Sequence, residues 1–262
     1  MKVVICAIAK CENNYINDWV NYHLNLGVDE IYLYDNNDPN YEPVESRIQR
    51  KDKVHITKIP GVKGFQSKKY TEFYNEHKND FDWIIFIDID EFIVLRDWKN
   101  IKEFLADSKF NSYPVVRLNW HLYGDDNKTS RDMSIPIYKG ITKRLTEHRY
   151  GSQAKEIIRG GLDNVVIPSS HFCKINGKLP KQVMPDGKPT DCEVKGLRDC
   201  NEAYINHYMT KTLKEFIDQK MQRSTDAGFP DRVIDLEYFW NINPKTPEKE
   251  KFAKEYINSL KK

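Results

Sequence analysis

Two uninterrupted apolar runs constrain the fold of this 262-residue chain more than any other feature of its sequence. They cover residues 3–9 (Val-Val-Ile-Cys-Ala-Ile-Ala) and residues 83–87 (Trp-Ile-Ile-Phe-Ile). Strands covered on both faces have this character, and they belong mainly to parallel sheets. Between the two runs the residue pattern predicts two helices and two more strands, at residues 14–26, 67–78, 30–34 and 54–59. This alternation predicts an α/β fold with a central, mostly parallel sheet flanked by helices.

The regular pattern loosens after residue 95. Residues 121–200 are rich in Gly, Pro, Lys and Asp, which indicates functional loops or a partly ordered segment. Here regular structure is predicted only in short pieces, at residues 102–106, 115–120 and 165–167. Two helices are predicted nearer the end, at residues 213–222 and 248–260.

The composition excludes several classes of protein. A net charge of +2, from 41 basic and 39 acidic residues, gives no basis for binding nucleic acid. No apolar run approaches the roughly 18 residues of a membrane span, and the N-terminal run is too short for a secretory signal. The five cysteines are irregularly spaced, so we expect reduced thiols and a cytoplasmic location. The alternative, a zinc site, would use His171, Cys173, Cys192 and Cys200, whose spacing matches no paired Cys-x-x-Cys pattern.

Acidic residues follow directly after the second apolar run. Asp88 and Asp90 are two positions apart, so on an extended chain they share one face and can approach the same cation, while Glu91 points elsewhere. Carboxylate and water ligands suit Mg²⁺ or Mn²⁺, which would neutralise a diphosphate. Alternatively, these carboxylates cap the next turn or pair with Arg96.

The loops after the first two strands are expected at the same sheet edge, where ligands bind in open α/β folds. Lys10 and Glu12 follow the first strand, and Asp35 and Asn36 follow the second. Asp35 could accept a hydrogen bond from a pyrimidine N3–H, with its neighbours at the ribose. The alternative is an ordinary Asn/Asp turn.

Two basic segments are candidates for binding phosphate. Gln66 and Lys69 lie at the start of a predicted helix, where both the helix N-terminus and lysine favour anions. His207 and Lys211 precede another predicted helix, and they could supply a third metal ligand and a diphosphate contact. A solvated face in the first case and a core histidine in the second are the alternatives.

The segment 120–126 (Trp-His-Leu-Tyr-Gly-Asp-Asp) combines an aromatic residue with two adjacent carboxylates. Trp120 could stack on a sugar ring. Asp125, ahead of Asp126, could take the proton of an acceptor hydroxyl as a general base. A plain turn is the alternative.

The order of these motifs resembles glycosyltransferase family 92 and its bacterial family-2-like relatives. The resemblance spans roughly residues 3–222. It is most specific in the opening Lys-x-Glu…Trp-x-x-Tyr-His-x-x-Leu-Gly-Val-Asp segment and in Asp-Ile-Asp-Glu-Phe at residues 88–92. It implies a GT-A (Rossmann-like) fold with a C-terminal, acceptor-side region of helices and loops. It also implies a nucleotide-sugar-binding half at residues 1–95, an acceptor-binding half at 96–222 and a C-terminal helical extension at 223–262.

Several residue roles follow from the resemblance. Asp88 and Asp90 match the D-x-D, whose second Asp is usually the direct metal ligand, and His207 matches the third protein ligand. Thr212 stands where Ser is commoner. Asp35 matches the uracil-contacting Asp, and the loop of Lys10 and Glu12 borders the nucleoside. Asn36 is expected at the ribose, and the expected donor-binding residues also include Gln66, Lys69, Asp88 and Lys211. For the base we expect Asp125 ahead of Asp126. Lys155 and His171 match residues that the family tends to keep, and no chemistry is assigned to them.

The implied activity is an inverting, metal-dependent transfer of a hexose, such as galactose, from a UDP-sugar. The implied acceptor is a glycan or lipid-linked glycan in capsular polysaccharide or lipopolysaccharide assembly. The expected cofactor is Mn²⁺ or Mg²⁺. A sugar-1-phosphate nucleotidyltransferase is an alternative, although the loop at residues 10–14 lacks its glycines. A non-catalytic carbohydrate-binding protein is another. The lysine-rich C-terminal helix suits either peripheral contact with the inner face of a membrane or simple solvation.

Overall fold

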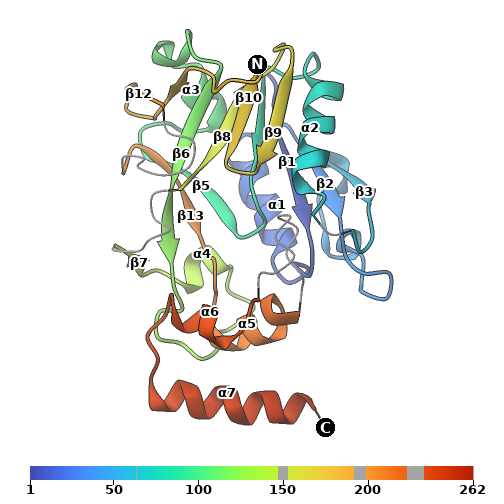
Figure 1. Cartoon of the computed structure of the whole chain (residues 1–262), viewed down its shortest axis with the longest axis vertical. Helices are drawn as coiled ribbons and strands as arrows, with labels where there is room; N and C mark the ends of the chain where they lie inside the picture. The colour runs from blue at the N-terminus through green and yellow to red at the C-terminus, as the bar shows by residue number, and fades with distance from the viewer. Residues whose placement is uncertain (63, 147–152, 192–198, 223–232, 262) are drawn as a thin grey trace.

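The computed structural model describes residues 1–62, 64–146, 153–191, 199–222 and 233–261, and a large mixed sheet lies at its centre (Figure 1). The main path of the sheet runs in the order β12-β11-β6-β8-β4-β1-β2-β3, with β13 paired to β5 and β6 and with β7 paired to β6. The strands are β1 (Val3–Ala9), β2 (Glu30–Asp35), β3 (Val54–Lys58), β4 (Trp83–Phe86), β5 (Glu91–Leu95), β6 (Val115–Tyr123), β7 (Arg144–Leu145), β8 (Ala154–Arg159), β9 (Val165–Ser169), β10 (Phe172–Ile175), β11 (Gln182–Val183), β12 (Pro189–Thr190) and β13 (Ala203–His207).

Helices cover both faces of the sheet and one of its ends. The α-helices are α1 (Ile16–Asn25), α2 (Gln66–His77), α3 (Ile101–Leu105), α4 (Ile137–Gly140), α5 (Leu213–Asp218), α6 (Leu236–Trp240) and α7 (Pro247–Leu260). Short 3-10 helices accompany them, at Val44–Arg47, Lys51–Lys53, Ser108–Phe110 and Lys220–Gln222. No helix in the described part of the chain is both long enough and apolar enough to cross a membrane.

The four strands β4, β1, β2 and β3 form the parallel part of the sheet. In their register Ala9 pairs with Asp35 and Cys6 with Phe86, so their carboxyl ends meet at one edge. The strand β8 runs antiparallel to both β4 and β6, which makes the other half of the sheet mixed. The predicted α/β fold is confirmed, and the parallel part positions the predicted site at a single sheet edge.

Strand β1 shows why both faces of the sheet are covered. Val3, Ile5 and Ala7 belong to a core that includes residues of α1, whereas Val4 and Cys6 belong to a core that includes residues of α2. All five side chains are fully buried. Burying a Val or Ile side chain contributes about 1.5–3 kcal/mol each, so this strand anchors both layers.

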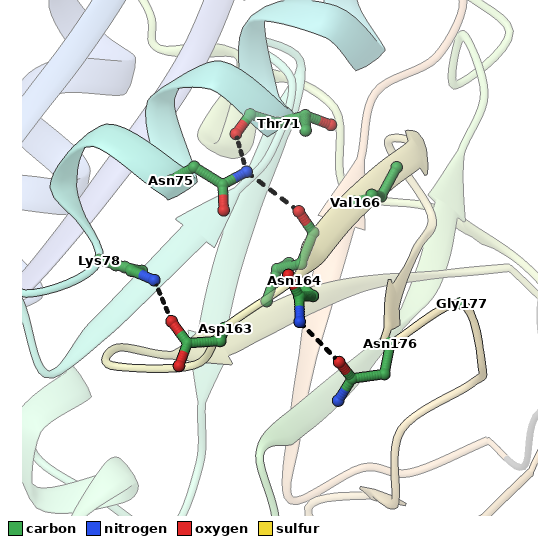
Figure 2. A pocket seen from close by; sticks show the side chains of 9 residues that line it. Thr71, Asn75, Lys78, Asp163, Asn164, Val166, Asn176 and Gly177 are labelled. Atoms are coloured by element: carbon green, nitrogen blue, oxygen red, sulfur yellow. Dashed lines mark hydrogen bonds and ion pairs between the residues drawn. The ribbon is translucent and has the colours of Figure 1, made fainter.

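The hairpin of β9 and β10 lies on the same side of the sheet as α2 (Figure 1). An open groove of about 780 Å³ lies between the hairpin and the C-terminal part of α2, and polar side chains line much of it (Figure 2). These side chains bond to one another and to the backbone. Asn75 Nδ2 donates to the carbonyls of Thr71 and Val165, and the amides of Asn164 and Asn176 bond at 2.8 Å. The bond from Asn75 to the Val165 carbonyl therefore holds the hairpin against α2.

Helices α5, α6 and α7 pack together beyond the carboxyl ends of the parallel strands (Figure 1). Their shared core includes Phe216 of α5, Phe239 of α6 and Ala253 of α7. The helical cluster thus begins at α5, before the predicted boundary at residue 223. On its outer side, Lys251 of α7 is paired with Glu255, so part of the lysine charge is neutralised. Membrane contact stays a prediction.

Candidate functional site

The acidic turn after β4 leads the chain into β5. Strand β4 ends at Phe86, so Asp88 and Asp90 lie in a turn and not on an extended strand. The buried carboxylate of Glu91 accepts the Asp88 N–H at 3.0 Å, and the Asp90 carbonyl accepts the Tyr208 N–H at 2.9 Å. The turn gives the two carboxylates different partners, and their joint approach to one cation stays a prediction.

The Asp88 carboxylate is held by two side chains. Lys155 Nζ lies 2.6 Å from Oδ2, and Gln66 Nε2 donates to Oδ1 at 2.7 Å. Lys155 is fully buried and also lies 3.6 Å from Glu91. Burial opposes the ionisation of Asp88, but the Lys155 ammonium holds its pKa below the usual value. Burial raises the pKa of Glu91 well above its usual range, so Lys155 acts mainly as the counter-ion of Asp88.

The Asp90 carboxylate lies among three nitrogen-bearing side chains. His207 Nε2 is 3.5 Å from Oδ1, and Lys220 and Lys211 are 3.4 and 3.8 Å from Oδ2. Burial disfavours the ionised form of Asp90, yet Lys220, His207 and Lys211 together hold its pKa well below its usual range. Burial lowers the pKa of His207, which leaves its imidazole neutral. A neutral imidazole beside an ionised carboxylate is a pair that can ligate a divalent cation.

The fit of a cation here rests on two residues. Within the described ranges no three His, Cys, Asp or Glu side chains converge on one point. Asp90 and His207 face each other, and the buried Nδ1 of His207 has no hydrogen-bond partner among the described residues. Asp88 is turned toward Lys155. The protein thus offers two of the three predicted ligands, and phosphate and water oxygens would complete the shell. The zinc alternative has no support in the described residues, and Cys192 lies outside them.

The loop between β13 and α5 brings Lys211 to Asp90. Lys211 has a left-handed backbone (φ 59°), and its ammonium lies 3.4 Å from Glu12 and 4.6 Å from the centre of the Tyr15 ring. Helix α5 begins directly afterwards with a capping box, in which Thr212 and Glu215 bond reciprocally. Tyr15 also donates to Glu215 at 2.8 Å, so the loops after β1 and β13 are tied together.

The loop after β2 is held by Asp35. Its buried carboxylate accepts the N–H groups of Asn37 and Val44, each at 3.1 Å. The Asn36 side chain bonds both ways to the backbone of Val62, and Lys10 lies 3.5 Å from Asp38. These bonds build a rigid loop at the sheet edge beside the β1 loop. Contact of Asp35 with a uracil ring stays a prediction.

Helix α2 begins at Gln66, whose side chain contacts Asp88. Lys69, one turn further on, pairs with Glu72 at 2.8 Å and lies 5.8 Å from the centre of the Tyr34 ring. Gln66 is therefore joined to the acidic turn. For Lys69 a phosphate contact stays a prediction.

Asp125 and Asp126 have partners that leave neither free to act as a base. The Asp125 carboxylate is 1% exposed, lies 2.5 Å from Lys249 Nζ of α7 and accepts the N–H of Asn127. Asp126 accepts the N–H groups of Thr142 and Lys143. A catalytic base must reach the acceptor hydroxyl, and these carboxylates instead fasten loops and α7 to the body. The geometry contradicts the predicted base role for both residues.

Trp120 forms an inner wall of the site. Its ring centre lies 4.2 Å from that of His207 and 5.0 Å from that of His171, and the side chain is only 5% exposed. The predicted stacking of a sugar on this ring finds no open face in the structure. His171 Nδ1 lies 3.0 Å from the Ala154 carbonyl, and because a carbonyl only accepts, Nδ1 carries the proton and donates it.

Two lysines of the site were not found, or not interpreted, from the sequence. Lys155 comes from β8, and Lys220 follows α5. Both are single lysines in segments without a distinctive motif, and only the folding of the chain brings them to Asp88 and Asp90. The signal for Lys155 lies in its strand, where it stands between Ala154 and Glu156 and just before two isoleucines, because a buried lysine requires a charged partner.

Comparison with known proteins identifies relatives along the whole chain. Residues 2–262 match the model of glycosyltransferase family 92. A family 92 protein of Ricinus communis is 27% identical over 170 residues, which cover 63% of this chain and 31% of the relative. A family 92 protein of Arabidopsis thaliana is 25% identical over 171 residues, covering 60% and 28%. The chain therefore spans about a third of the length of these relatives.

Solved structures show a more distant likeness. Staphylococcus aureus TarS in complex with UDP-GlcNAc is 12% identical, with a TM-score of 0.38, over 74% of this chain and 60% of that chain. A structure of TarS residues 1–349 is 14% identical, with a TM-score of 0.33, over 61% and 47%.

Proposed function

The chain belongs to glycosyltransferase family 92, and we propose that it transfers a hexose from a UDP-sugar to a glycan acceptor with the help of a divalent cation. The observation that carries this proposal is the Asp90 carboxylate at the carboxyl edge of the parallel strands, with His207 on one side and two lysines on the other. A carboxylate and a neutral imidazole suit Mn²⁺ or Mg²⁺, and the two ammonium groups suit a diphosphate.

The reaction is a single displacement at the anomeric carbon. The acceptor oxygen bonds to that carbon while the bond from the carbon to the β-phosphate oxygen breaks, so the configuration inverts. UDP leaves with the bonding electrons, and the hydroxyl proton passes to a base. When bound, the cation would neutralise charge on the departing diphosphate.

The chain's own residues prepare this step. Asp90 and His207 would hold the cation, and Lys211 and Lys220 would donate to phosphate oxygens. Asp88, about one third exposed and fixed by Lys155 and Gln66, presents an oriented carboxylate that can accept from a hydroxyl of the donor. Preorganised charges of this kind need no reorientation during the reaction.

The nucleoside end of the donor is assigned to the loops after β1 and β2. Asp35 pairs with Ala9 at the end of β1, so the Asp35 loop lies beside the segment that leads from β1 to Glu12. A glycan or lipid-linked glycan acceptor, as in capsular polysaccharide or lipopolysaccharide assembly in the cytoplasm, is part of the proposal, as is galactose or a related hexose.

A donor screen tests the proposal. Purified protein is incubated with Mn²⁺ and UDP-galactose, UDP-glucose or UDP-GlcNAc, and the UDP released by slow donor hydrolysis or by transfer to oligosaccharides is measured. We expect release from one donor above the others and its loss after chelation with EDTA. Binding of a donor without any release would favour the non-catalytic alternative. Release of pyrophosphate from UTP and a sugar phosphate would favour a nucleotidyltransferase.

A further inference from the structure

The turn between β9 and β10 lies at the same edge of the sheet as the acidic turn. Strand β9 runs along α2 from the C-terminal part of the helix to its first turn, where Ser67 Oγ donates to the Pro168 carbonyl at 2.9 Å. Gln66, the neighbour of Ser67, holds the Asp88 carboxylate. His171 follows in the turn at the tip of the hairpin. The packing of β9 on α2 thus carries His171 to the candidate site.

The rings around His171 define its position more closely. The centre of its imidazole lies 5.0 Å from that of the Trp120 ring, and the Trp120 ring lies 4.2 Å from the ring of His207. Lys155 Nζ, which is bonded to Asp88, lies 5.9 Å from the centre of the same Trp120 ring. His171 therefore belongs to the shell of side chains around Asp88 and His207.

The bond at Nδ1 of His171 leaves the opposite ring nitrogen as an acceptor. Nδ1–H donates to the Ala154 carbonyl, which fixes the ring and puts the lone pair on Nε2. Nε2 has no partner among the described residues and is not enclosed, because the histidine is partly exposed. Burial and the Lys155 ammonium lower the pKa of His171 from 6.5 to about 3, so the lone pair stays available at neutral pH.

The carboxylates near the site have other partners or no access to solvent. Asp88 is held by two side chains and is assigned to the donor, and Glu91 is fully buried. Asp125 and Asp126 fasten other segments of the chain. A histidine with a pKa of about 3 is close in base strength to an aspartate, whose ordinary pKa is about 3.9. His171 therefore offers the accessible lone pair that these carboxylates do not.

We propose that His171 is the catalytic base, and that its Nε2 takes the proton of the acceptor hydroxyl as the hydroxyl oxygen attacks the anomeric carbon. This inference rests on the proposed function and names the base that the reaction needs. The electron pair of the O–H bond stays on the acceptor oxygen, the proton bonds to Nε2, and UDP leaves with the electrons of the broken bond to the sugar. The nearby Asp88 carboxylate favours the imidazolium that results.

Water and azide distinguish a base from a residue with another role. Either can attack the donor in place of a glycan, but a water molecule must lose a proton, whereas the azide ion carries none. UDP release is measured with Mn²⁺ from UDP-galactose, UDP-glucose or UDP-GlcNAc, whichever the donor screen selects, with and without sodium azide. Mass spectrometry identifies the glycosyl azide product.

The variant His171→Gln keeps a hydrogen-bond acceptor but cannot take up a proton. We expect it to lower donor hydrolysis by roughly 100-fold or more, while transfer to azide and UDP affinity stay within about threefold of wild type. The matched control is His77→Gln at the other end of α2, where the imidazole pairs with Asp80 at 3.0 Å. This control should change none of the three quantities. His171→Asn, whose amide can donate to the Ala154 carbonyl, repeats the test should His171→Gln fold poorly.

Two results would overturn the inference and leave the proposed function standing. One is donor hydrolysis by the folded His171 variants within about threefold of wild type. The other is an equal loss of hydrolysis and of azide transfer, because His171 would then act on the donor and not on a proton. Absence of UDP release from all three donors with wild-type protein, with or without azide, would instead overturn the proposed function itself.

Discussion

At the scale of single residues, partners decide what each carboxylate in this molecule does. Asp88 faces Lys155 and Gln66, whereas Asp90 faces His207 and two lysines, although one residue separates them in sequence. By the same reasoning Asp125 is a poor candidate for the catalytic base, because its carboxylate is paired with Lys249 of α7. A carboxylate motif therefore acquires its role from the side chains that the fold brings to it.

Asp125→Asn should damage stability and spare catalysis. The change leaves Lys249 buried without its counter-ion, which costs about 3–5 kcal/mol of unfolding free energy. Urea denaturation measures the loss, and turnover of the protein that remains folded should stay within about twofold of wild type. Asp125→Asn combined with Lys249→Met should cost less than the sum of the single changes, because the two share one interaction. Intact stability with strongly reduced turnover would restore Asp125 as the base.

Glu156 makes stability depend on pH. Burial raises its pKa from 4.5 to about 7, against the opposing effects of Arg117 and Cys173, so the folded protein holds a proton that the unfolded chain releases. Stability contributed by this group is therefore complete below pH 4.5 and is lost as the pH rises toward 7. Glu156→Gln should equal wild type in unfolding free energy at pH 4.5 and exceed it by about 1–3 kcal/mol at pH 8. Parallel pH profiles of the two proteins would contradict this.

At the scale of elements, apolar runs and helix signals predicted most of the scaffold. Residues 3–9 and 83–87 became β1 and β4, and the pattern at 248–260 became α7. The predicted strand at residues 83–87 is one residue longer than β4, because a strand's last residue depends on pairing with distant chain segments. The ion pairs of Lys155, Lys220 and Asp125 were equally hidden, since each joins segments at least 67 residues apart.

The N-cap of α5 couples helix stability to the site. Thr212 caps α5 and directly follows Lys211, while Thr246 caps α7 away from Asp90. Thr212→Ala and Thr246→Ala should each cost about 1 kcal/mol of unfolding free energy. Only Thr212→Ala should also weaken Mn²⁺-dependent UDP binding, by roughly 3- to 10-fold, because a shifted Lys211 loses part of its phosphate contact. Equal UDP affinities of the two variants, measured calorimetrically, would show that the α5 cap does not influence the site.

At the scale of the whole molecule, the parallel strands, the β13–α5 loop and the C-terminal helices converge on one sheet edge (Figure 1). The sheet supplies the loops of Asp35 and Glu12, and α5 supplies the fixed end of the segment that carries Lys211. The candidate site thus lies at an edge where these three parts of the chain meet, as is usual for open α/β folds.

The central claim is that Asp90 anchors a metal–diphosphate site. Isothermal titration of UDP into wild-type protein, with Mn²⁺ and with EDTA, tests it most directly, with Asp90→Asn and Asp88→Asn in parallel. We predict UDP binding that requires Mn²⁺ in wild type, persists with Mn²⁺ dependence in Asp88→Asn, and disappears in a folded Asp90→Asn protein. Metal-independent UDP binding in wild type, or Mn²⁺-dependent binding unchanged in Asp90→Asn, would contradict the account.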